Sequence, residues 1–506
     1  MNYKDTNTLG ELKKSGYKTL SVKDEIRKNL VEKIKSKDPI FEGIIGYEKS
    51  VIPSIVNSLL AKHDIILLGL RGQAKTKMAR LIPTLLDEFI PVVKGSEIND
   101  DPFNPISKFA VDAIAANGDS TEIEWVSRDR RYSEKLATPD VNIADLIGDI
   151  DPIKAANQRL HYSHEGAIHF GIIPRTNRGI FVINELPDLQ PRIQVGLLNI
   201  MQEKDIQIRG FNIRIPLDIL MVFTANPEDY TNRGNIITPL KDRIDSQIIT
   251  HYPKALEDGI KITSTYSWTE RDKKKKMVIP YYFREIIEMT AMQARSSEFV
   301  DQKSGVSARL TISSIENLIS NAERRAIINN DELIMPRMCD VISILPGITG
   351  KVELVFEGEQ EGAVKVAKAL ISRSVREIFK KYFPDPLLKK KKTAAAEKEV
   401  KDPYAEIIEW FQYGGKVNIK DDMTFKEYIG ELRKVDGLEK YVKKFTQYYE
   451  SEQELASLME FVLDGLHQNS KIAKDEIDSE IFYKDMVGSM FTQGGNYGGY
   501  EDEYYK

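Results

Sequence analysis

The sequence predicts an α/β fold in which a parallel sheet flanked by helices is followed by an α-helical lid and a further helical C-terminal segment. Three short apolar runs are separated by helical stretches: IILLGL at 65–70, GIFVINEL at 179–186 and ILMVFTANP at 219–227. Buried runs that alternate with helices are typical of a parallel sheet covered on both faces. After His251 the strand signals fade, and charged amphipathic helices dominate from residue 281 to about 383.

Length and composition indicate more than one domain. At 506 residues, 41% hydrophobic and 29% charged, the chain can bury one large core and at least one smaller one. The formal net charge of -5 argues against a protein that binds nucleic acid through bulk positive charge. The single cysteine, Cys339, excludes an intramolecular disulfide and a cysteine-rich metal site. We find no signal region and no segment that could span a bilayer, so we expect a cytoplasmic protein.

Changes in residue pattern divide the chain into six parts. Near the start, Ser21 is placed to cap a helix that carries Val22, Ile26, Leu30 and Ile34 at helical spacing. The parts that we expect are an N-terminal helical segment (1–38), an α/β nucleotide-binding domain (39–252), a helical lid with its extension (253–387), a lysine-rich linker (388–401), a C-terminal helical segment (402–490) and a disordered tail (491–506).

A phosphate-binding loop follows the first apolar run, in the order strand, loop, helix that a P-loop needs. Glycines let backbone N–H groups face the phosphates of ATP, Lys75 can reach the β and γ phosphates, and the Thr76 hydroxyl can ligate Mg²⁺. Ala74 stands where a second glycine is usual, and alanine does not readily tolerate a strongly positive φ, so nucleotide affinity could differ. The alternative is a chance turn after a buried strand. The expected nucleotide-binding residues are Gly69, Gly72, Gln73, Ala74, Lys75 and Thr76.

The second apolar run ends in Asn184 and Glu185, where a Walker B motif would lie. Such a strand normally ends in Asp-Glu, in which the Asp holds the magnesium shell and the Glu polarises the attacking water. Here Asn184 can still accept a hydrogen bond from a magnesium-bound water, but it carries no charge, so we expect weaker metal binding. Glu185 keeps the role of the base. The alternative is an ordinary core strand with a solvated Glu at its end.

Three further side chains complete the predicted catalytic set. Asn226, at the end of the third apolar run, can bridge the attacking water and the γ-phosphate as a first sensor. Arg243 ends a short helix and is the expected arginine finger, and Arg309 in the lid is the expected second sensor. Each arginine alone would more typically form a surface ion pair. The order of the four motifs in the chain favours the catalytic interpretation.

Two other clusters receive no functional role. His161, His164 and His169 fall within nine residues but fit no standard ligand spacing, so we expect ordinary polar residues and not a metal site. The run Arg128-Asp129-Arg130-Arg131 is expected to be a solvated loop.

From about residue 40 to 330 the sequence resembles AAA+ P-loop NTPases of the magnesium-chelatase ATPase subunit and MoxR-type clade. Ahead of the P-loop, IIGYE at 44–48 is similar to the family's Val-Gly-Gln-Glu motif, and LATPDVNIADLIGDI at 136–150 to its threonine-acid-leucine-glycine segment. The run AIHFGIIPRTNRGIFVINE at 167–185 matches the clade closely, with Asn177-Arg178-Gly179 as the clearest landmark. IQIRGFNIRI at 206–215 looks like the clade's pre-sensor hairpin. Ala74, Asn184, the hydrophilic stretch at 94–131 and the long C-terminal part depart from the chelatase subunit.

The resemblance implies an ATP- and Mg²⁺-dependent, chaperone-like ring, expected to be a homo-hexamer, that remodels a partner protein, often one with a von Willebrand factor A domain. Insertion of magnesium into a porphyrin is not expected. One rival is an AAA+ transcriptional activator, which needs a Gly-Ala-Phe-Thr-Gly-Ala loop and a helix-turn-helix that we do not find. Another is a nucleotide-binding scaffold that no longer hydrolyses ATP, which Ala74 and Asn184 would favour.

Overall fold

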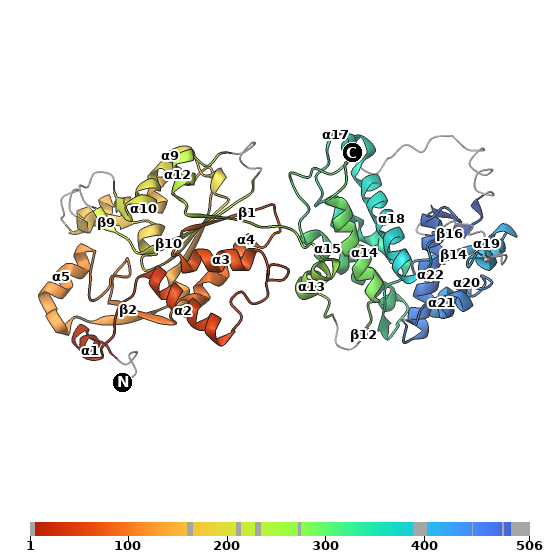
Figure 1. Cartoon of the computed structure of the whole chain (residues 1–506), viewed down its shortest axis with the longest axis horizontal. Helices are drawn as coiled ribbons and strands as arrows, with labels where there is room; N and C mark the ends of the chain where they lie inside the picture. Colours follow the sequence, from red (N-terminus) through yellow and green to blue (C-terminus); the bar gives the residue numbers. More distant parts are fainter. Residues whose placement is uncertain are drawn as a thin grey trace, which may run out of the picture. The chain divides into compact units, whose positions relative to one another are not determined.

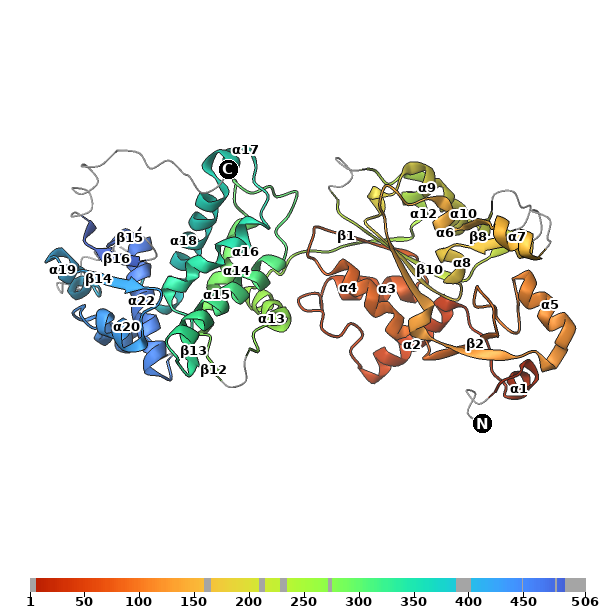
Figure 2. The same ribbon diagram turned by 180° about the vertical axis from the view of Figure 1, so that it is seen from behind.

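The computed structural model divides the chain into two compact units, residues 1–252 and 253–506 (Figures 1 and 2). The structure describes residues 6–158, 165–208, 214–227, 234–271, 275–387, 402–447, 449–477 and 480–486. The predicted linker at 388–401 and the predicted tail at 491–506 lie outside the described residues. Among the described helices, none combines the length and the apolar character needed to span a bilayer.

A five-stranded parallel sheet forms the centre of the first unit. Its spatial order is β11-β1-β10-β7-β4, so the strands follow each other across the sheet as fifth, first, fourth, third and second in the chain. The three predicted apolar runs supply β1, β7 and β10. This sheet, with helices on both faces, confirms the predicted α/β fold class. The strands are β1 (Ile65–Leu68), β4 (Tyr132–Leu136), β7 (Gly179–Asn184), β10 (Ile219–Ala225) and β11 (Ser246–Ile249).

Alternation along the strands sends side chains to two separate cores, one on each face of the sheet. Val182 and Val222 face the core formed with α2 (Val22–Ser36), α3 (Val51–Leu60) and α4 (Lys75–Leu81). Phe181 and Phe223, their neighbours in the chain, face the other core. Figure 1 shows α2, α3 and α4 on one side of the sheet and α9, α10 and α12 on the other. The helices of this second face are α6 (Ile143–Leu146), α8 (Ile172–Arg175), α9 (Pro191–Gly196), α10 (Leu198–Gln202) and α12 (Thr238–Arg243).

The N-terminal helix α2 belongs to the first of these cores. Its N-cap is Ser21, as predicted, whose side chain accepts a hydrogen bond from the Asp24 N–H. Val22, Ile26 and Leu30 are buried with the residues of β1. Ile34, the fourth predicted core position, is instead exposed, because the helix extends past the edge of the core at its last turn.

The first unit also contains short helices and two-stranded sheets outside the central sheet. Three antiparallel ladders pair β2 with β3, β5 with β6, and β8 with β9. The last of these closes the predicted hairpin at 206–215, of which residues 209–213 lie outside the described residues. The elements are α1 (Leu9–Lys14), β2 (Phe89–Val93), α5 (Lys108–Asn117), β3 (Ile123–Ser127), β5 (Gly148–Ile150), α7 (Pro152–Gln158), β6 (Ile168–Phe170), β8 (Asp205–Gln207) and β9 (Arg214–Pro216).

A buried ion pair joins α2 to the turn before β4. Arg131 donates from Nη1 and Nη2 to the two carboxylate oxygens of Glu25, over 2.7 and 2.6 Å, and from Nε to the Arg178 carbonyl over 2.7 Å. The two side chains are only 1% and 4% exposed. The prediction of a solvated loop at 128–131 is therefore wrong for Arg131, because a partner 106 positions away in the chain compensates its buried charge.

The second unit is mainly helical and is packed around one large core, whose buried residues run from Leu256 to Tyr483. Helices on both sides of the predicted linker contribute to it; the stacked rings of Tyr282 in α14 and Phe461 in α22 lie 4.7 Å apart. The helices are α13 (Leu256–Tyr266), α14 (Tyr281–Ala294), α15 (Arg309–Ile328), α16 (Leu345–Thr349), α17 (Phe356–Glu361), α18 (Ala363–Tyr382), α19 (Ala405–Gln412), α20 (Phe425–Leu432), α21 (Leu438–Phe445) and α22 (Glu452–Gln468).

The second unit also contains strands that the sequence did not predict. An antiparallel sheet in the order β14-β16-β15 lies within the otherwise helical C-terminal segment. A short parallel pair joins β12 to β13. The strands are β12 (Lys276–Met277), β13 (Leu333–Ile334), β14 (Val417–Lys420), β15 (Ala473–Ile477) and β16 (Glu480–Lys484).

The Glu25–Arg131 pair gives a stability prediction. We expect Glu25→Gln to lower the free energy of unfolding by about 3 to 5 kcal/mol, because it leaves the buried Arg131 charge uncompensated. Chemical denaturation measures this loss. Asp119→Asn is the matched control, since Asp119 pairs with Lys13 over 2.6 Å with side chains 69% and 51% exposed; we expect a change of about 0.5 kcal/mol or less there. Equal effects of the two variants would contradict a structural role for the buried pair.

Candidate functional site

The predicted nucleotide site lies at the carboxyl ends of three neighbouring strands. Leu68 at the end of β1 is paired with Ala225 in β10, and Ile183 in β7 is paired with Phe223 in β10. The P-loop, Asn226 and the pair Asn184-Glu185 therefore all leave the sheet at the same edge. Such an edge, beside the point where the strand order reverses, is where ligands bind in open α/β sheets.

The backbone of the P-loop favours residues with little or no side chain at positions 69, 72 and 74. A Cβ on Gly69 would lie 1.9 Å from Thr250 Oγ1 and 2.2 Å from Gln73 Oε1, so a side chain there would displace both. Gly72 has a φ of 75°. Ala74 has a φ of 59°, so it adopts the left-handed conformation that the sequence analysis expected alanine to tolerate poorly. The surrounding loop sustains a cost of roughly 1–2 kcal/mol for it.

Three side chains that the sequence analysis did not single out, those of Tyr47, Thr250 and Tyr252, hold the P-loop in place through hydrogen bonds. Tyr47 Oη lies 3.1 Å from the Gln73 carbonyl and 2.6 Å from the His251 carbonyl. Tyr252 donates to the Arg71 carbonyl over 2.8 Å, and Thr250 donates to Gln73 Oε1 over 2.6 Å. Burial raises the pKa of Tyr47 to about 12, so its hydroxyl keeps the proton that it donates. Tyr47 lies in the IIGYE stretch, which was the available signal; the end of β11 carried none.

Lys75 begins α4, and its ammonium group lies inside the loop. It donates to the carbonyls of Gly69 and of Leu70, the latter over 3.0 Å, and to Asn226 Oδ1 over 2.8 Å. Lys75 is only 7% exposed. The predicted phosphate-binding lysine and the predicted first sensor are thus in direct contact, which places a cation and an amide together at the mouth of the P-loop.

A chain of hydrogen bonds connects Thr76, Asn184, Thr224 and Glu185. Asn184 Oδ1 accepts from the Thr76 hydroxyl over 3.4 Å and from the Thr224 hydroxyl over 3.2 Å. The backbone N–H of Glu185 donates to Thr224 Oγ1 over 3.1 Å. Thr224, which is fully buried, therefore ties the end of β10 to the end of β7. Glu185 has a φ of 55°, a second non-glycine residue of the site in the left-handed region.

These residues fit ATP and Mg²⁺. The loop offers backbone N–H groups at the start of α4 and a lysine ammonium, which suit phosphate oxygens. The Thr76 hydroxyl, the Asn184 amide oxygen and the Glu185 carboxylate are hard oxygen groups of the kind that Mg²⁺ prefers, and Mg²⁺ commonly uses few protein ligands beside phosphates and waters.

Within the described residues, no group of three or more His, Cys, Asp or Glu side chains is arranged to hold a metal ion. His161 and His164 lie outside the described residues. His169 is an exposed residue of β6.

Of the two predicted arginines, Arg243 is hydrogen-bonded to residues outside this network, and Arg309 belongs to the second unit. Arg243 is the last residue of α12, where Nε and Nη2 donate to Gln202 Oε1 over 3.0 and 2.6 Å and Nη1 donates to the Pro239 carbonyl over 2.8 Å. These acceptors are neutral, whereas the alternative of a surface ion pair would require a carboxylate such as that of the neighbouring Asp242 or Asp245. Arg309 is an exposed residue at the start of α15 in the second unit.

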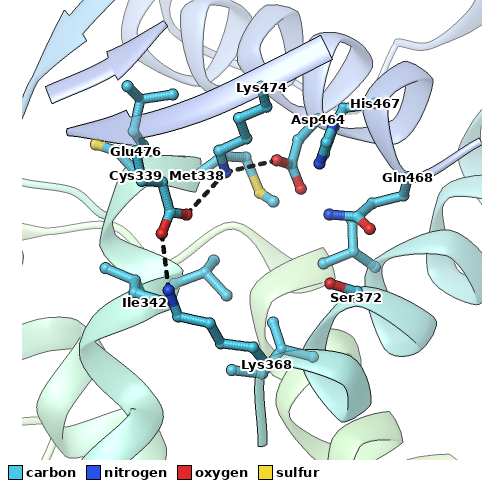
Figure 3. Close-up of a pocket in the computed structure, with 14 residues that line it drawn as sticks. Met338, Cys339, Ile342, Lys368, Ser372, Asp464, His467, Gln468, Lys474 and Glu476 are labelled. Atoms are coloured by element: carbon cyan, nitrogen blue, oxygen red, sulfur yellow. Dashed lines mark hydrogen bonds and ion pairs between the residues drawn. The ribbon is translucent and has the colours of Figure 1, made fainter. Parts of the chain in front are cut away.

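The second unit contains a cavity of about 290 Å³. Figure 3 shows Lys474 between Asp464 and Glu476 in its wall, with Lys368 reaching the same Glu476. The Lys474–Asp464 and Lys368–Glu476 ion pairs measure 2.8 and 3.0 Å. Because these cations are already neutralised by carboxylates, the cavity lacks the anion-binding character of the P-loop.

No family model matches the chain. The archaeal Lon protease of Methanocaldococcus jannaschii is 28% identical over 119 residues, which cover 21% of this chain and only 18% of the length of that protein. That protein's similarity to this chain is therefore confined to a small part of either sequence.

The solved structures to which the chain is similar include the complex between subunits BchI and BchD of magnesium chelatase. There the identity is 16%, the TM-score 0.34, and the coverage 63% of this chain and 98% of that chain. A proposed ATPase from Cytophaga hutchinsonii is 18% identical with a TM-score of 0.29, over 71% and 97% of the two chains. NtrX from Brucella abortus is 13% identical with a TM-score of 0.29, over 61% and 54%. All these scores are low, so the α/β fold class of this chain rests on its own strand order and on the helices that cover both faces of its sheet.

Proposed function

We propose that this protein binds ATP with Mg²⁺ at the P-loop and hydrolyses it. The observation that carries the proposal is the connected network at the carboxyl ends of β1, β10 and β7. In it, Lys75 contacts Asn226, and Asn184 contacts both Thr76 and Thr224. Groups suited to bind phosphate, to ligate a cation and to activate water thus meet at one edge of the sheet.

Each side chain has a distinct task in this proposal. Bound Mg·ATP would supply the transferable phosphoryl group and a metal ion that neutralises developing charge. The Lys75 ammonium would bind the phosphates, and Thr76 and Asn184 would bind Mg²⁺ or its water ligands. Glu185 accepts a proton from the attacking water, while Asn226 orients that water from the next strand. Thr224 fixes the positions of Asn184 and Glu185 relative to each other.

The proposal extends to a ring of identical chains, a hexamer, that uses hydrolysis to remodel a partner protein such as one with a von Willebrand factor A domain. The motif resemblance supports this part, and so does Arg243, because its guanidinium donates to neutral acceptors among the described residues and so keeps its charge available. Arg309 would act as the second sensor. Proteolysis is not part of the proposal, since the likeness to the archaeal protease covers 18% of that protein.

A nucleotide-binding scaffold without hydrolysis is the second candidate. The observation that favours it is the neutral Asn184 at the position of the usual aspartate, together with the left-handed Ala74 in the loop. Turnover, not binding, separates the two candidates.

The test compares Lys75→Ala with Glu185→Gln. We expect Lys75→Ala to abolish binding of labelled ATP, because it removes the ammonium from the loop. Glu185→Gln should bind ATP like the unchanged protein but turn it over at least 10²-fold more slowly, in the range of about 10² to 10⁴ for a lost general base. Equilibrium binding and steady-state ATPase rates measure the two effects. If the unchanged protein binds ATP without turnover, the scaffold is correct; if Lys75→Ala still binds, the P-loop assignment is wrong.

The ring proposal predicts that Arg243 completes the site of the adjacent subunit. Arg243→Ala alone should lose on the order of 10³-fold in rate, the contribution typical of an arginine finger. Lys75→Ala alone should also be inactive. Mixed rings contain interfaces with an intact P-loop from one chain and an intact Arg243 from another, so the mixture should regain part of the activity.

The control for this experiment is Arg27→Ala, which removes an exposed arginine from α2 and should leave the rate unchanged. Ring formation by the mixture is checked by light scattering. If mixtures at all ratios form rings but stay inactive, Arg243 does not act between subunits.

A further inference from the structure

The Asn184 side chain has a defined orientation. Its Oδ1 accepts from the hydroxyls of Thr76 and Thr224, which lie on α4 and β10. A carboxamide carries its acceptor and its donors at opposite ends. With the oxygen committed to the two hydroxyls, the amide nitrogen is left for a partner on the other neighbouring strand, β4.

Glu134 is the carboxylate on that strand. It is paired with Val182 in the ladder between β4 and β7, so it lies on the same face of the sheet as Val182 and, two positions further, Asn184. Because side chains alternate between the two faces, Glu134 and Asn184 project from neighbouring strands on one side of the sheet. The same face carries α4. Arg80 and Tyr132 contribute most to the lowered pKa of Glu134, and the nearby Asn184 side chain lowers it further.

Two other side chains fix Glu134 in place. Arg80, one turn after Thr76 in α4, donates to both carboxylate oxygens, from Nε over 3.0 Å and from Nη2. Tyr132 donates to Glu134 Oε2 over 2.7 Å, and burial raises the pKa of this tyrosine, so it remains a donor. The Glu134 side chain is 27% exposed. The carboxylate is therefore ionised, ordered and within reach of the Asn184 amide.

We propose that Glu134 is a positioning residue of the metal site, which accepts a hydrogen bond from the Asn184 amide and so holds the Asn184 oxygen toward Thr76. The proposal rests on the proposed binding of Mg²⁺ and nucleotide at the P-loop. Outer groups that orient a metal-facing side chain commonly change metal affinity by 10- to 100-fold when removed. Asn184 and Glu134 then act as a pair, in which the carboxylate stands one strand away from the position where Walker B motifs normally carry it.

In this arrangement, removing the charge of Glu134 should have opposite effects in the natural protein and in Asn184→Asp, which a merely structural role would not produce. In the natural protein the pair is an amide donor and a carboxylate acceptor. In Asn184→Asp the two positions carry like charges and the hydrogen bond is lost, so Glu134 becomes unfavourable. Removing the charge of Glu134 should therefore harm the natural protein and help the Asn184→Asp variant.

The experiment measures the Kd of a fluorescent ADP in Mg²⁺ and in EDTA, and takes the ratio as the enhancement by Mg²⁺. We expect Glu134→Gln to reduce this enhancement by roughly 10-fold, with binding in EDTA unchanged. Asn184→Asp with Glu134→Gln should show a larger enhancement than Asn184→Asp alone. Tyr132→Phe, which removes one donor to Glu134, should shift the enhancement in the same direction as Glu134→Gln but less.

Glu122→Gln is the matched control, since Glu122 forms an exposed ion pair with Lys94 over 2.7 Å in another part of the unit. Thermal unfolding checks that each variant is folded, and Tyr132→Phe stands in if Glu134→Gln is not. Effects of the same sign in both backgrounds, or no effect in either, would overturn the role of Glu134 while leaving nucleotide binding intact. Absence of ADP binding by the natural protein would overturn the proposed function itself, and this inference with it.

Discussion

The register between β10 and its two neighbours is the constraint on which the candidate site depends. β10 is paired on one side with β1 and on the other with β7, so the last residues of the three strands reach one edge together. The Gly69 N–H donates to the Ala225 carbonyl over 3.1 Å, which continues the ladder into the first residue of the P-loop. A slip of one residue in either pairing would turn Thr224 and Asn184 to the opposite face of the sheet and away from α4. The backbone hydrogen bonds of the sheet therefore determine which side chains of β7 and β10 face α4 at the candidate site.

The rigidity of that edge explains how the site sustains unfavourable backbone conformations. Ala74 and Glu185 both occupy the left-handed region, at a cost of the order of 1–3 kcal/mol each. Such conformations persist only where the surroundings determine them more strongly than local preference does. Tyr47 and Thr250 provide this for the P-loop, and the bond from the Glu185 N–H to Thr224 provides it for the end of β7. The unfavourable backbone conformations and the hydrogen bonds that maintain them therefore occur in the same small region, as is expected of a functional site.

The sequence was sufficient for those parts of the molecule that depend on local pattern. Apolar runs predicted β1, β7 and β10, and the strand-loop-helix order predicted the P-loop, because both signals are contained in a dozen neighbouring residues. Arg131 was misjudged because its partner, Glu25, lies 106 positions away and no local pattern reveals it. Strands β14 to β16 were missed because they are short and lie among charged helices, where side-chain alternation over a few residues resembles a helix end. The same local signals brought Lys75, Asn184 and Asn226 to one edge of the sheet, where hydrogen bonds now connect Lys75 to Asn226 and Thr76 to Asn184.

The neutral Asn184 need not mark a lost function. A carboxylate at the end of β7 and one at Glu134 would be like charges on one face of the sheet, and two such groups cannot both ionise without cost. An amide at one position and a carboxylate at the other removes that cost, and in our proposal the two groups are also hydrogen-bonded. Because Arg80 comes from α4, the helix that also carries Lys75 and Thr76, the ion pair with Glu134 ties the P-loop helix to the far edge strand. In our proposal Asn184 and Glu134 are therefore one feature, in which the negative charge lies one strand further out while the Asn184 oxygen stays bonded to Thr76 and Thr224.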